Sequence, residues 1–230
     1  MQSNIFQAGD FVFPYDYKFP GQASDENILF VTRENKSLLL LRQLFILLTA
    51  LLFLALAFAL GDFLQNWTNL AIYLKFFALI LAVVMVFVSW WWVNKIWLKS
   101  LAIVTNKRLT KIIYTTPFNR HSLSLPLEMI VDTGSYTKGF IQALFKLATF
   151  TARSSASSSG VATDDTARVN KKYFYIENIA IAEDLQHYVN KLLEAQKHQR
   201  DKLDKFRPFV PNLKGERRKE FMKNYPDYWS

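Results

Sequence analysis

Two long apolar runs, separated by a short polar connector, constrain this chain more than any other feature. A helix rises about 1.5 Å per residue, so residues 38–60 and 72–93 are each long enough to cross a hydrocarbon core of roughly 30 Å. Neither run has a polar residue every three or four positions, as a half-exposed soluble helix would. We therefore expect a transmembrane helical hairpin over residues 37–94. The alternative is a buried helical pair in a soluble domain, but few domains of this size cover two such helices on all sides.

Within the hairpin, small residues recur at a spacing of four. Ala55 and Ala59 lie in the first run, and Ala78 and Ala82 lie in the second. Small residues at this spacing let two helix backbones approach closely. We expect these two faces to meet.

Charge is distributed unevenly along the chain. Residues 1–94 carry five Lys or Arg against six Asp or Glu, whereas residues 95–230 carry 23 against 13. The connector between the runs has no Lys or Arg, while basic residues precede the first run and follow the second. By the positive-inside rule, we expect a multi-pass protein of the cell (plasma) membrane with both termini in the cytoplasm.

After the second run, the hydrophobic period becomes that of short strands. Apolar stretches on either side of residues 105–108 predict a β-hairpin, and residues 121–126 alternate polar and apolar side chains. Residues 173–176 predict a last strand, and an amphipathic helix is expected from about Ile181. We predict an α+β fold for residues 95–205: a seven-stranded or similar small β-barrel or sandwich, capped by the C-terminal helix.

The remaining segments are less regular. Residues 1–36 form an N-terminal cytoplasmic segment whose alternating aromatic residues end in proline, which indicates either an extended conformation or a partly ordered tail. Residues 153–168 are rich in Ser, Ala and Thr and predict a flexible loop. Residues 206–230 form a basic, proline-broken C-terminal tail.

The order of these motifs resembles the bacterial pleckstrin-homology-like (bPH) membrane proteins. The matching segments are residues 25–31, 101–109, 125–130 and 174–179. The resemblance covers roughly residues 25–193 and implies a PH-like domain after the two spans. It implies no particular activity, because the family has no general one. The chain departs from the family pattern at residues 146–148, where a Tyr/Phe-Gly pair is common, and we expect a local difference in the backbone there.

The chemistry of the chain favours binding over catalysis. The chain has no cysteine, its three histidines are scattered, and it lacks phosphate-loop and nucleophile motifs. We predict no enzyme, no cofactor and no metal site. We expect a membrane-anchored binding or scaffolding module whose partners are the bilayer, anionic lipid headgroups, a membrane or cytoplasmic protein, or a second copy in a homo-oligomer, and not nucleic acid. The alternative is a subunit of a channel or transport assembly, although the aromatic-rich second run favours lipid contact.

The candidate binding residues are Lys107, Arg108 and Lys111, which cluster at the first predicted hairpin. The resemblance suggests this position, since some pleckstrin-homology domains hold anionic headgroups there. Near an anionic membrane, each Lys or Arg contributes about 1 kcal/mol within a Debye length of about 8 Å. Two alternatives stay open. The cations either keep the turn soluble, or they meet a protein, since a strand of seven residues carries the turn about 20 Å from the second run.

Overall fold

The computed structural model describes residues 11–12, 18–65, 71–155, 173–198, 203 and 206–209. These residues form two compact units. One unit comprises residues 36–100 together with residues 114–121, and the other comprises the remaining described residues. The predicted loop after Ser155 and most of the C-terminal tail lie outside the described residues.

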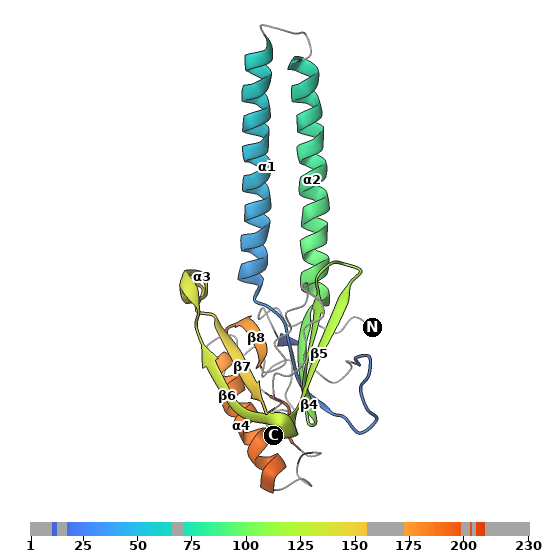
Figure 1. The fold of residues 1–230 in the computed structure, drawn as a ribbon, viewed down its shortest axis with the longest axis vertical. Coiled ribbons are helices and arrows are strands. Elements are labelled where there is room, and N and C mark those ends of the chain that lie inside the picture. Colours follow the sequence, from blue (N-terminus) through green and yellow to red (C-terminus); the bar gives the residue numbers. More distant parts are fainter. Residues whose placement is uncertain are drawn as a thin grey trace, which may run out of the picture. The chain divides into compact units, whose positions relative to one another are not determined.

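Helices α1 (Lys36–Gln65) and α2 (Ala71–Lys99) lie side by side as a hairpin (Figure 1). Both extend beyond the predicted spans, because the helical backbone continues through the polar residues that flank each apolar run. Most of their large Leu, Phe and Val side chains are exposed rather than buried. The structure confirms two helices that are long and apolar enough to cross a membrane.

The contact between α1 and α2 corrects one detail of the prediction. The alanines predicted at this contact are Ala55, Ala59, Ala78 and Ala82. The pair in α2 is buried, but the pair in α1 is exposed, so our choice of face on α1 was wrong. That face instead contains Gln43, whose Nε2 donates to Oδ1 of Asn94 at 3.2 Å, and Gly61, where an added Cβ would lie 2.8 Å from Cε of Lys75. Gln43 and Gly61 are five turns of 3.6 residues apart, so both lie on the same face of α1, which is the face that contacts α2.

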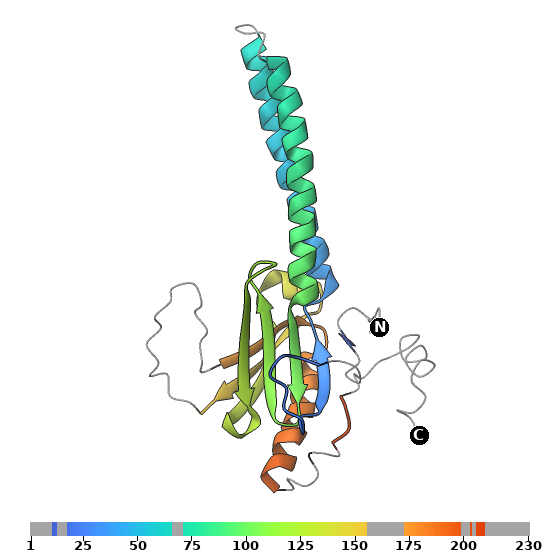
Figure 2. The same ribbon diagram turned by 90° about the vertical axis from the view of Figure 1, so that its right-hand side faces the viewer.

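The strands form two sheets in which the paired strands run antiparallel (Figure 2). The first sheet has the order β1-β2-β3-β4-β5 and the second the order β6-β7-β8. Their bounds are β1 Phe11–Val12, β2 Ile28–Thr32, β3 Leu101–Thr105, β4 Arg108–Tyr114, β5 Arg120–Pro126, β6 Ile130–Tyr136, β7 Ala148–Ser154 and β8 Tyr173–Ile179. The predicted hairpin around residues 105–108 is confirmed as β3–β4.

The two sheets do not close into a barrel, so the barrel form of our prediction was wrong. Pro126 ends β5, and the one-turn 3₁₀ helix η1 (Leu127–Met129) carries the chain into the second sheet. A closed barrel needs a continuous ladder of backbone hydrogen bonds, and proline lacks the N–H donor. Among the described strands, β5 pairs only with β4, and β6 pairs only with β7.

Helix α4 (Ala182–His198) begins within one residue of the predicted start. Its apolar face presents Leu185, Val189 and Leu192, all fully buried. These side chains join a core that includes Phe150 from β7 and Val104 from β3. The observed fold is therefore α+β, with two antiparallel sheets and a C-terminal helix on a shared core.

Strand β2 comes from the segment that precedes the first helix. It pairs with β3, and Phe30 and Val31 are fully buried. The start of the C-terminal tail also reaches this strand: the Phe209 N–H donates to the carbonyl of Leu29 at 2.9 Å, and the Phe209 ring lies 4.8 Å from that of Phe30. Segments on both flanks of the predicted domain thus contribute to its core.

Candidate functional site

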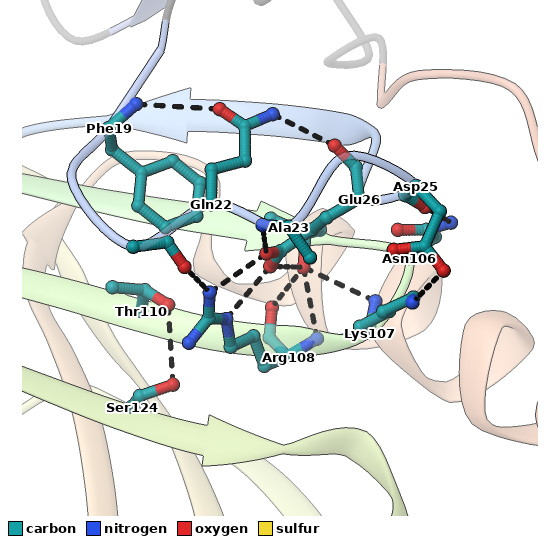
Figure 3. A network of polar contacts seen from close by, with 12 residues as sticks. Phe19, Gln22, Ala23, Asp25, Glu26, Asn106, Lys107, Arg108, Thr110 and Ser124 are labelled. Carbon is teal, nitrogen blue, oxygen red and sulfur yellow. Dashed lines mark hydrogen bonds and ion pairs between the residues drawn. The ribbon is translucent and has the colours of Figure 1, made fainter.

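The β3–β4 turn, which carries the predicted binding residues, is held by a carboxylate from the segment before α1 (Figure 3). Nε and Nη2 of Arg108 donate to Oε1 and Oε2 of Glu26 at 2.9 and 2.8 Å. Glu26 also accepts from the Thr105 hydroxyl at 2.8 Å and from the Ala23 N–H at 3.1 Å. Only 3% of Glu26 is exposed, so both oxygens of a buried carboxylate are satisfied within the protein.

Asn106 adds a reciprocal contact between the same two segments. Its backbone N–H donates to the carbonyl of Asn27 at 3.1 Å, and its Oδ1 accepts from the Asn27 N–H at 2.9 Å. The side-chain amide of Asn106 therefore takes the place of a strand partner at Asn27, just before β2 begins. The two segments matched in the resemblance, residues 25–31 and 101–109, form one network of contacts.

A β-turn positions the other side of the Arg108 guanidinium. Pro20 and Gly21 occupy its centre, and the Gln22 N–H donates to the carbonyl of Phe19 at 3.2 Å. Gly21 has φ +84°, which glycine adopts readily at the third position of such a turn. Its carbonyl accepts from Nη2 of Arg108, and the guanidinium carbon lies 5.5 Å from the centroid of the Phe19 ring.

These contacts determine the charge state of the clamp, by which we mean the paired side chains of Glu26 and Arg108. Burial by itself raises the pKa of Glu26, but hydrogen bonds from Arg108, Ala23 and Thr105 outweigh it, so the pKa lies below its usual value. The hydrogen bond from Lys107 likewise lowers the pKa of Asp25. The carboxylate of Glu26 is therefore ionised over the physiological pH range, where it stays paired with the Arg108 guanidinium.

All three predicted binding residues have carboxylate partners. Lys107 forms an ion pair with Asp25, Arg108 pairs with Glu26, and Nζ of Lys111 lies 3.4 Å from Oε2 of Glu177. The structure brings the three cations together on one hairpin, as expected, and balances each charge locally. Whether they bind anionic headgroups remains a prediction.

A second candidate surface lies where the two sheets stay open. A groove of about 320 Å³ runs along β5 and reaches η1, β7 and β8. Its lining consists of residues 122–126, Met129, Ser154, Tyr173 and Phe174. The groove follows the outer edge of β5, which has no further strand beside it in the described part of the chain.

Sequence reasoning missed both the role of Glu26 and this groove. Glu26 lies in one of the matched segments, but nothing in a sequence pairs a carboxylate with an arginine 82 positions later. The groove depends on the sheets separating at Pro126, and the only signal for that is the proline itself.

No protein-family model, curated protein or solved structure matches this chain. The resemblance to bPH proteins therefore stays a prediction.

Proposed function

We propose that this protein is a non-enzymatic, membrane-anchored binding module that holds an extended segment of a partner protein at the edge of β5. In this proposal α1 and α2 span the plasma membrane, and both termini lie in the cytoplasm. The observation that carries the proposal is the edge of β5 beside the groove, which pairs with no further strand among the described residues.

The helical hairpin supports anchoring. Its outward surface is made of large apolar side chains, which water would not tolerate over such a length. Nε2 of Gln43 donates to Oδ1 of Asn94 between the helices, and Nδ2 of Asn94 donates to the carbonyl of Trp90, so these groups bond within the protein rather than to water. This arrangement favours lipid contact over a pore lining, and we therefore place the channel or transport subunit second.

The edge of β5 supports binding of an extended peptide. An unpaired edge strand offers backbone N–H and C=O groups to an added strand, and neighbouring pockets then select alternate side chains of the peptide. Here the groove beside the edge is lined by Leu123, Met129 and Phe174 among others. A partner with apolar side chains at every second position fits this surface.

The charge balance at the β3–β4 turn argues against lipid phosphate as the ligand of that turn. A lipid phosphate would have to compete with the carboxylates of Asp25, Glu26 and Glu177 for the three cations. Glu26 is buried and bonded through both oxygens, so displacing it would leave an unpaired buried charge.

The test compares two substitutions of the same kind. Met129 lines the groove and is 47% exposed, whereas Val131 is 55% exposed but lies outside the groove. The full chain and its Met129→Glu and Val131→Glu variants are purified in mild detergent, and the co-purifying proteins are quantified. We expect Met129→Glu to lose a partner about tenfold while Val131→Glu retains it, since a charge in an apolar pocket costs more than about 1.4 kcal/mol. Equal recovery with both variants would reject the groove as the binding surface.

A further inference from the structure

We propose that α3 (Gly139–Leu144) and the residue that follows it insert into the interface of the same bilayer that holds α1 and α2. Lys138 and Lys146 would then contact lipid phosphates on either side of the inserted turn. This inference rests on the membrane-spanning role proposed for α1 and α2, and its test separates the two.

A helix on the surface of a domain usually turns its apolar side chains toward the core and its polar side chains toward water, and α3 has the reverse arrangement. Phe140 is 79% exposed and Leu144 61% exposed, Ile141 and Phe145 are exposed as well, and α3 contributes no buried residue to the core. Its polar residue faces the domain: Nε2 of Gln142 donates to the Thr149 hydroxyl at 3.1 Å. A helical turn that is fastened by its polar side and presents four large apolar side chains has the pattern of an interfacial insertion.

A chain of hydrogen bonds ties α3 to the entrance of the first helix. Nε2 of Gln142 donates to Oδ1 of Asn178 at 2.7 Å, and Nδ2 of Asn178 donates to Oε1 of Glu34 at 2.8 Å. The Asn35 N–H donates to the backbone carbonyl of Asn178 at 3.0 Å. One peptide bond then joins Asn35 to Lys36, where α1 begins, and the apolar run starts at Leu38, about 3 Å further along the helix.

Asn178 connects α3 to the residues before α1. It has φ +60°, a left-handed conformation that asparagine tolerates better than most residues. One side chain thereby bonds the base of α3 and the last residues before α1. Because α3 is fixed to the point where the chain leaves for the first span, the bilayer is the apolar phase within its reach.

The lysine after α3 also occupies an unusual backbone position. The N–H groups of Lys146 and Leu147 donate to the carbonyls of Ala143 and Gln142 at 3.2 and 2.8 Å, which is the Schellman pattern at a helix C-terminus. Lys146 has φ +52°, where glycine is favoured. A cation therefore occupies a position at which a side chain strains the backbone.

The charges around α3 fit an anionic surface. Lys138 and Lys146 are exposed, and within the described residues neither ammonium pairs with a carboxylate. In this respect they differ from the three cations of the β3–β4 turn. Two cations flanking four apolar side chains match the phosphates and acyl chains of a lipid leaflet.

Depth measurements on the full chain test this inference. The chain has no cysteine, so a nitroxide is attached at Phe140→Cys, at Leu52→Cys in α1 or at Lys191→Cys in α4. Each protein is reconstituted in vesicles of phosphatidylcholine and phosphatidylglycerol. Collision rates are measured with oxygen, which enters the bilayer, and with a water-soluble nickel complex. We expect the label at residue 140 to be several-fold less accessible to nickel than the label at 191, with oxygen accessibility approaching that at 52.

Each other outcome has a definite meaning. Nickel accessibility at 140 equal to that at 191 overturns the insertion. Shielding from both reagents, or dipolar broadening between labels, shows instead that protein covers α3 and also overturns it. A label at 52 that meets nickel but little oxygen would reject the spanning role itself.

Lys146→Gly is a matched variant for the charge. It removes a cation and places glycine at a position that glycine favours, so unfolding should not occur at a lower temperature. Insertion of the residue-140 label should weaken by about fivefold, equivalent to about 1 kcal/mol for one lysine near an anionic surface. An unchanged label depth in vesicles with and without phosphatidylglycerol would overturn the role of the lysines.

Discussion

Glu26 and Arg108 are 82 positions apart in the sequence, with both helices of the hairpin between them, yet their side chains form two hydrogen bonds of 2.9 and 2.8 Å. The domain is therefore completed only when the chain has passed through the hairpin and returned. Thr32 at the end of β2 pairs with Ala102 at the start of β3, so the helical hairpin is inserted into a β-hairpin connection.

Replacing Glu26 by Gln should strongly destabilise the domain. The half-buried Arg108 guanidinium would lose its charged partner, and the buried site of residue 26 would hold an amide in place of the bonded carboxylate, which costs about 3 kcal/mol. We expect the thermal unfolding midpoint of the full chain in mild detergent, followed by circular dichroism, to fall by about 10 °C. The matched control is Asp25→Asn, which removes the exposed pair with Lys107 and should leave the midpoint nearly unchanged. Equal effects of the two variants would contradict a buried clamp.

Stability should fall in acid, and Glu26 should be a main cause. A carboxylate whose pKa is lower in the folded state stabilises the fold above its unfolded pKa, and that contribution disappears as the pH falls through the folded value. The ordinary pKa of a glutamate is 4.5, so the loss begins near that pH and continues below it. The midpoint of the parent should therefore drop more steeply below pH 4.5 than that of Glu26→Gln, and parallel curves would refute this assignment.

The insertion of the helices into a β-hairpin predicts a soluble version of the domain. Residues 18–35 joined by two glycines to residues 100–230 omit β1 but retain the pairing of β2 with β3 and the contacts of Glu26 with Arg108, Thr105 and Ala23. We expect this protein to unfold cooperatively, whereas residues 95–230 alone lack β2 and should not. Circular dichroism and amide exchange distinguish the two cases. Cooperative unfolding of residues 95–230 would mean that β2 is dispensable.

The sequence predicts those elements whose signal lies within one segment. The apolar runs give α1 and α2, and the 3.6-residue period after Ile181 gives α4. Contacts between distant segments leave no such signal. Ala55 and Ala59 are four residues apart, and so are Ala57 and Gly61, so the spacing alone does not show which pair faces α2. Gln43, whose amide bonds to Asn94 of α2, lies on the same face as Gly61. The three cations were placed correctly on one hairpin, but their carboxylate partners come from the N-terminal segment and from β8.

The cap formed by α4 gives a prediction on the core. Leu192 is fully buried among residues of that core, and its truncation leaves a cavity. We expect Leu192→Ala to lower the free energy of unfolding of the soluble version by about 2–5 kcal/mol in a urea titration. The exposed neighbour Lys191→Ala is the control and should change it by less than about 0.5 kcal/mol. A similarly small loss for Leu192→Ala would mean that α4 does not cap the core.

The most direct test of a membrane-anchored cytoplasmic module is labelling of single cysteines in intact cells. The chain has no cysteine of its own, so each signal comes from one introduced site. The exposed Lys191 of α4 reports on the domain, and Asn66 reports on the connector between the helices. With a membrane-impermeant maleimide, we predict that Asn66→Cys reacts in intact cells and that Lys191→Cys reacts only after lysis. The reversed pattern, or equal labelling of both sites before lysis, would contradict the account.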